Sequence, residues 1–106
     1  MGLYYQKVAT LTDLKPGETK QISPRRGAHI LLCNVAGIIY AVKDACTHDG
    51  GILGWGCLEG NIIECPRHGA QFDVITGDVV APPAGTPLLT YAVRIVGQDI
   101  EVGLED

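Results

Sequence analysis

The sequence has no long apolar run and no excess of positive charge. Its longest apolar stretch, Ile30 to Val42, is interrupted by Asn34 and Gly37 and is too short to cross a bilayer. No basic segment followed by an apolar one opens the chain, so we expect an unanchored, cytoplasmic protein with no membrane partner. Eight Lys and Arg against twelve Asp and Glu give a formal net charge of −4, which argues against nucleic acid as a partner.

Methionine, tryptophan and phenylalanine each occur once, whereas the 106 residues include fourteen glycines and six prolines. This composition favours turns over long helices, and the length suits one domain with a modest core. No G-x-G-x-x-G motif is present, so no nicotinamide or flavin site is indicated.

Short apolar or alternating segments separated by turn residues predict an all-β fold of antiparallel strands. We expect three hairpins, with strands at 29–35 and 38–42, at 57–59 and 62–64, and at 70–74 and 78–80. A half-buried strand is predicted at 89–95, and a strand at 100–104 follows it after a turn. Near the start of the chain, a capped turn at 12–17 leads into an edge strand at 18–22.

Histidine is scarce, and two of the three histidines fall in a pattern with two of the four cysteines. Cys46-Thr47-His48 forms C-x-H, and after sixteen intervening residues Cys65-Pro66-Arg67-His68 forms C-x-x-H. Thiolates and imidazoles on two short loops are typical of a [2Fe-2S] cluster with cysteines on one iron and histidines on the other. We therefore predict that one [2Fe-2S] cluster per chain is held by Cys46, His48, Cys65 and His68.

A structural zinc site is the alternative for these four residues, because tetrahedral S₂N₂ coordination is common for zinc. Zinc modules usually begin with Cys-x₂₋₄-Cys and pair like ligands, unlike the C-x-H motif here. A zinc-stabilised interaction module therefore stays open as a second hypothesis.

Over nearly its whole length the chain resembles the Rieske-type ferredoxins. The resemblance is carried by both ligand motifs and by Leu58-Glu59-Gly60, Phe72-Asp73, Thr76-Gly77 and Pro82-Pro83. It implies antiparallel sheets with the cluster at the tip, beside a proline-rich loop similar to residues 81–85. We expect one Rieske domain, 1–106, with a cluster-binding subdomain at about 44–85 inserted in a β scaffold of residues 1–43 and 86–106.

The resemblance implies an electron carrier, the ferredoxin component of a bacterial aromatic-ring-hydroxylating dioxygenase. Its partners would be a flavin-dependent ferredoxin reductase and a terminal oxygenase. The chain itself is not expected to be an enzyme. Once two histidines bind the cluster, only His29 remains, too few for a two-His, one-carboxylate iron site. The small subunit of an assimilatory nitrite reductase, similar in size and fold, is the alternative.

The sequence departs from the high-potential Rieske proteins of respiratory complexes. Those proteins carry a disulfide between the ligand loops, and the matching positions here are Gly51 and Arg67. They also place Ser and Tyr hydroxyls near the cluster, where this chain has Ala70 and Phe72. Hydrogen bonds to the sulfurs raise the potential, so we expect the low end of the Rieske range.

Five other residues have weaker signals. Cys33 is expected in the core, and Cys57 is expected to be a small core residue that begins a strand. Trp55 is expected to pack under the cluster loops, with an exposed docking aromatic as the alternative. A surface or capping role is expected for His29, and Arg67 would meet either an acidic partner or solvent.

Overall fold

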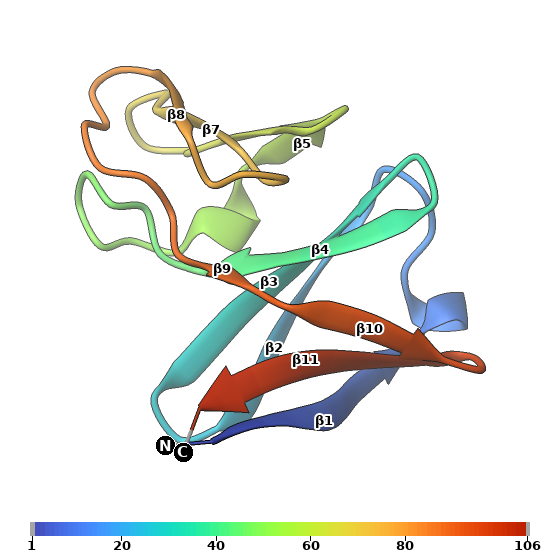
Figure 1. Cartoon of the computed structure of the whole chain (residues 1–106). Coiled ribbons are helices and arrows are strands. Elements are labelled where there is room, and N and C mark those ends of the chain that lie inside the picture. Colours follow the sequence, from blue (N-terminus) through green and yellow to red (C-terminus); the bar gives the residue numbers. More distant parts are fainter. Residues whose placement is uncertain (1, 106) are drawn as a thin grey trace.

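The computed structural model describes residues 2–105, which are built mainly of short antiparallel strands (Figure 1). Within that range the helical structure consists of two 3-10 turns, η1 (Leu11–Asp13) and η2 (Leu53–Trp55). Neither is long or apolar enough to cross a membrane. The strands are β1 (Leu3–Thr10), β2 (Thr19–Arg25), β3 (Ala28–Val35), β4 (Ile38–Lys43), β5 (Cys57–Glu59), β6 (Ile62–Glu64), β7 (Gln71–Asp73), β8 (Val79–Ala81), β9 (Thr90–Tyr91), β10 (Val93–Val96) and β11 (Asp99–Glu105).

The strands form three antiparallel sheets, which confirms the predicted all-β fold. Their orders are β1-β11-β10, β2-β3-β4-β9 and β5-β6-β7-β8. The third sheet lies at the top of Figure 1, away from the two chain termini, and the other two sheets lie below it. All residues of the third sheet come from one stretch of chain, 57–81, between β4 and β9.

Strand β3 separates two hydrophobic cores. Ile30 and Leu32 face the lower core, between the sheets that contain β3 and β11. Leu31 and Cys33 face the upper core, which they share with Phe72 of the third sheet. These β3 side chains are fully buried, so both faces of the strand are covered and the segment reads as a continuous apolar run rather than an alternation.

The three predicted hairpins are confirmed, and β2 is an edge strand as expected. The predicted strand at 89–95 is wrong as a single element. It divides at Ala92 because β9 pairs with β4 in one sheet, whereas β10 pairs with β11 in another. Leu89 and Ile95 are 58% and 45% exposed, so the expected half-buried face is incomplete at both ends. The capped turn predicted at 12–17 overlaps η1, which begins one residue earlier, at Leu11.

Replacing Phe72 by alanine should lower the free energy of unfolding by about 3–5 kcal/mol, because the ring is fully buried and its removal leaves a cavity. Urea unfolding of the variant measures the change. Ile38→Ala on β4 is the control, since that side chain is 59% exposed and its loss should change stability by less than about 0.5 kcal/mol. Equal losses in the two variants would show that the upper core does not stabilise the fold.

Candidate metal centre

The first ligand loop follows β4 and is closed by its own backbone. The N–H of Cys46 donates to the carbonyl of Gly51 (2.8 Å), and the N–H of Gly50 donates to the carbonyl of Cys46 (2.7 Å). Gly50 has φ +74°, a left-handed conformation that glycine adopts without strain. The loop therefore makes a tight turn that starts at its cysteine.

The second ligand loop follows β6 and closes in the same way. The N–H of Cys65 donates to the carbonyl of Ala70 (2.7 Å), and the N–H of Gly69 donates to the carbonyl of Cys65 (3.2 Å). Gly69 has φ +75°, close to the +74° of Gly50, and each glycine is the fourth residue after its cysteine. The two cysteines thus begin turns of equal length, although the histidine comes two residues after the first and three after the second.

Both cysteines point into the upper core. Cys46 and Cys65 are each 1% exposed, and both are free thiols. Burial raises the pKa of the Cys46 thiol, and the backbone amides of His48 and Asp49 act in the opposite direction. Because burial disfavours an unpaired thiolate, this pair of sulfurs is a donor set that a metal cation would complete.

Both histidines lie at the surface. The rings of His48 and His68 meet edge to face, with centroids 5.2 Å apart and an interplanar angle of 89°. Both residues are exposed, and the side chain of His68 is 60% exposed. The structure therefore places sulfur donors inside and nitrogen donors outside.

This division of donors suits two metal ions better than one. Among residues 2–105, one group of donor atoms within 4.8 Å of one another contains the sulfurs of Cys46 and Cys65, and another contains the imidazoles of His48 and His68. Asp49 offers a carboxylate oxygen to each group. Paired thiolates and paired imidazoles on separate sides fit a two-iron cluster, whereas tetrahedral zinc would draw all four donors together.

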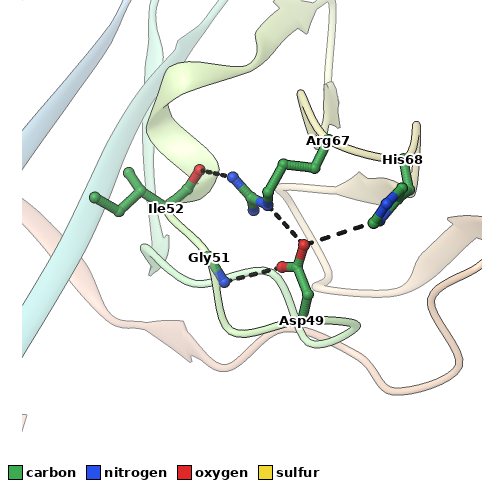
Figure 2. A network of polar contacts seen from close by, with 5 residues as sticks. All are labelled: Asp49, Gly51, Ile52, Arg67 and His68. Atoms are coloured by element: carbon green, nitrogen blue, oxygen red, sulfur yellow. Dashed lines mark hydrogen bonds and ion pairs between the residues drawn. The ribbon is translucent and has the colours of Figure 1, made fainter.

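The sequence analysis did not single out Asp49, which links the two ligand loops (Figure 2). Its carboxylate accepts a hydrogen bond from Nε of Arg67 (2.6 Å) and one from the backbone N–H of Gly51 (2.9 Å). These bonds hold the pKa of the Asp49 carboxyl at about 2, with Arg67 as the larger cause. Arg67 is exposed, as the solvent alternative expects, but its guanidinium is also paired with Asp49 within the chain, a contact that was not expected.

The proline-rich loop lies beside the first ligand loop. The hydroxyl of Thr47, the residue between the first cysteine and histidine, donates to the carbonyl of Thr86 (2.6 Å). Ala84 in the same segment is buried in the upper core. The loop after β8 is thereby fastened to the candidate centre.

The structure bears out some of the weaker signals and corrects others. Cys33 is fully buried, and burial raises its pKa to about 12, which confirms the core assignment. His29 is exposed and its Nδ1 lies 3.1 Å from the hydroxyl of Ser23, as a surface role requires. Cys57 does begin a strand, but it is exposed, because Leu58 is the β5 side chain that packs on the core.

The expectation that Trp55 packs under the cluster loops is wrong, since the residue is 67% exposed. The turn η2 packs through Leu53 instead, which is fully buried. Glycines on both sides of Trp55 allow the close approach of the backbone: a Cβ on Gly56 would collide with the carbonyl oxygen of Glu64. The tryptophan is therefore presented to solvent, which agrees with the alternative of an exposed aromatic.

Comparison with known proteins gives a consistent result. Residues 4–92 match the model of the Rieske [2Fe-2S] domain. The ferredoxin component of biphenyl 2,3-dioxygenase from Rhodococcus jostii (strain RHA1) is 40% identical over 99 residues, which are 93% of this chain and 92% of that protein. A ferredoxin from Sphingomonas yanoikuyae B1 superposes with a TM-score of 0.91 at 29% identity, covering 96% of this chain and all of that one.

A structure described as a complex of reduced oxygenase and oxidized ferredoxin in carbazole 1,9a-dioxygenase contains a similar chain. The TM-score is 0.88 and the identity 33%, over 92% of this chain and 91% of that one. A Mycobacterium tuberculosis protein that is described, without further proof, as an NADH-dependent nitrite reductase small subunit also superposes, with a TM-score of 0.85. Its identity is 17%, over all of this chain and 99% of that one, so this likeness shows the fold alone.

Proposed function

Because this chain belongs to the Rieske [2Fe-2S] family, we propose that it carries single electrons from a flavin-dependent ferredoxin reductase to the terminal oxygenase of an aromatic-ring dioxygenase system. A bound Rieske cluster supplies one-electron redox chemistry. The observation that supports a carrier most strongly is the pair of exposed imidazoles above two buried thiols. A docked partner could exchange an electron through these exposed imidazoles, while the core shields the buried sulfurs from solvent.

We assign the cluster to Cys46 and His48 on the first loop and to Cys65 and His68 on the second. The assignment rests on the buried sulfurs and on the imidazole pair 5.2 Å apart. We also propose that residues 44–85 act as the cluster-binding part of the single domain, and that the carrier works in the cytoplasm. The family match leaves the zinc-stabilised module without support.

Electron transfer to an oxygenase tests this function directly. The reduced protein would be mixed in a stopped-flow instrument with oxidised terminal oxygenase of a biphenyl dioxygenase system, and its reoxidation followed by absorbance. We expect one electron to leave each chain at a rate that saturates with oxygenase concentration. If no transfer occurs to this oxygenase or to those of carbazole and naphthalene systems, and the chain instead elutes stably with a large nitrite reductase subunit, the nitrite reductase alternative is correct.

Ala70→Ser should raise the midpoint potential of the cluster. Ala70 is fully buried in the same core as both cysteines, and its carbonyl accepts a hydrogen bond from the N–H of Cys65, so we expect a hydroxyl there to reach a cluster sulfur. Hydrogen bonds to cluster sulfurs stabilise the reduced, more negative state. Redox titration measures the potential, with Ala84→Ser, at another buried alanine of the same core, as the control. A larger shift in the control would contradict the role given to position 70.

A further inference from the structure

We propose that Asp49 and Arg67 form a non-covalent clasp that fastens the two ligand loops together and balances charge on the histidine side of the cluster. The inference rests on the proposed cluster site. It assigns a positioning role to two residues outside the ligand set. Arg67 stands at one of the two positions where the respiratory proteins described above carry the disulfide cysteines, and its guanidinium lies against Gly51, which is the other position.

The clasp joins residues that are distant in sequence. Asp49 follows His48 on the first loop, and Arg67 precedes His68 on the second. Nε of Arg67 lies 2.6 Å from Oδ2 of Asp49, and Figure 2 shows the arginine side chain extending from one loop to the other. The other ion pairs of Lys or Arg with a carboxylate among residues 2–105, Lys7–Asp99 and Arg94–Glu101, lie outside the ligand loops.

Both ends of the clasp are anchored by the backbone. Oδ1 of Asp49 accepts from the N–H of Gly51 (2.9 Å), and Nη1 of Arg67 donates to the carbonyl of Ile52 (3.1 Å). A Cβ on Gly51 would collide with the guanidinium carbon of Arg67, so the glycine provides the space that the arginine occupies. An exposed ion pair usually contributes little to stability because two long side chains must be ordered. Here the neighbouring backbone already fixes both partners.

The clasp lies next to the imidazoles. Oδ2 of Asp49 is 4.0 Å from Nδ1 of His68, and one oxygen of Asp49 is within 4.8 Å of a nitrogen of His48. A lone carboxylate at this position would oppose the addition of an electron, and a lone guanidinium would favour it. Paired, the two charges largely cancel, so their removal one at a time should move the potential in opposite directions.

Single and double neutral variants test the clasp. Asp49→Asn should raise the midpoint potential and Arg67→Gln should lower it. In each variant the equilibrium constant for reduction should change at least about threefold, which is a shift of about 28 mV for a one-electron couple. The double variant should return towards the potential of the unmodified chain. All three should lose iron to a chelator faster than the unmodified chain, because the loops are no longer fastened.

The pair Arg94–Glu101 provides a matched control. Its Nε–Oε1 distance is also 2.6 Å, but it joins β10 to β11 and lies outside the ligand loops. Arg94→Gln and Glu101→Gln should leave both the potential and the rate of iron loss unchanged. Arg67→Lys keeps the charge but loses the contacts to both Asp49 and the carbonyl of Ile52, so it should still release iron faster than the unmodified chain. Its midpoint potential should stay within about 10 mV of that of the unmodified chain, which is about one sixth of the shift for a tenfold change in the reduction equilibrium.

Shifts of the same sign in Asp49→Asn and Arg67→Gln, or rates of iron loss equal to those of the control variants, would overturn the clasp. Such results would leave the cluster assignment intact, provided that the unmodified protein shows the reduced-state EPR signal of a Rieske cluster. The absence of that signal in the unmodified protein would instead overturn the proposed function on which the clasp depends.

Discussion

Cys65→Ser is expected to yield a folded chain with little or no iron and sulfide. Soft thiolates select iron–sulfur clusters, and the serine hydroxyl is a poor replacement. Cys65 is 1% exposed and shares a donor group with Cys46, and neither Cys33 nor Cys57 belongs to that group. Iron and acid-labile sulfide analysis, together with the visible absorption spectrum, measures the effect. Cys46→Ser should behave in the same way.

Cys57→Ser is the matched control for this experiment. Cys57 begins β5 and is exposed, so its replacement should leave the iron content unchanged. If Cys65→Ser retained a full complement of iron, or if Cys57→Ser lost it, the assignment of the cysteine ligands would be wrong. Comparison of the two variants also separates loss of a ligand from general sensitivity to cysteine replacement.

His48→Cys should lower the midpoint potential by about 100 mV or more, or cause loss of the cluster. Rieske clusters lie at roughly −150 to +300 mV and all-cysteine plant-type clusters at about −400 mV, because an anionic thiolate adds negative charge where imidazole is neutral. One replacement should produce a substantial part of that difference. Spectroelectrochemical titration of the purified variant measures it.

His29→Cys is the control, since it makes the same substitution at an exposed histidine of β3 that lies beside Ser23. Its midpoint potential should match that of the unmodified protein. A fully loaded His48→Cys variant with an unchanged potential would contradict the role of His48 as a ligand.

Local sequence patterns were sufficient where structure depends on neighbours in the chain. The hairpin at 57–59 and 62–64 was predicted with its observed bounds, because Gly60 and Asn61 supply a two-residue turn between two short apolar runs. The C-x-H and C-x-x-H motifs likewise identified residues that the structure brings together in two donor groups. In both cases the information lies within a few residues.

Prediction was less successful where distant segments decide the outcome. Strand β1 was not predicted, and its register against β11 shifts between Lys7 and Ala9, which interrupts a simple alternation. The split between β9 and β10 depends on which sheet each half joins. These features depend on pairing partners far away in the sequence.

Side-chain contacts between loops were the hardest features to foresee. Asp49 follows a candidate ligand in a glycine-rich loop, and this adjacency to His48 was the available signal for its role. Its partner Arg67 is eighteen residues away, and the ion pair between them forms only when both loops are folded. The exposure of Trp55 similarly follows from the close contacts of Gly54 and Gly56 rather than from its own hydrophobicity.

Pulsed EPR of the dithionite-reduced protein, produced with ¹⁵N-labelled histidine, tests the central claim most directly. We expect a rhombic signal from a reduced [2Fe-2S] cluster, with hyperfine couplings from two histidine nitrogens that change when the label is introduced. His48→Cys should remove one of the two couplings. A cluster signal without histidine coupling, or an EPR-silent protein that contains zinc, would contradict the account.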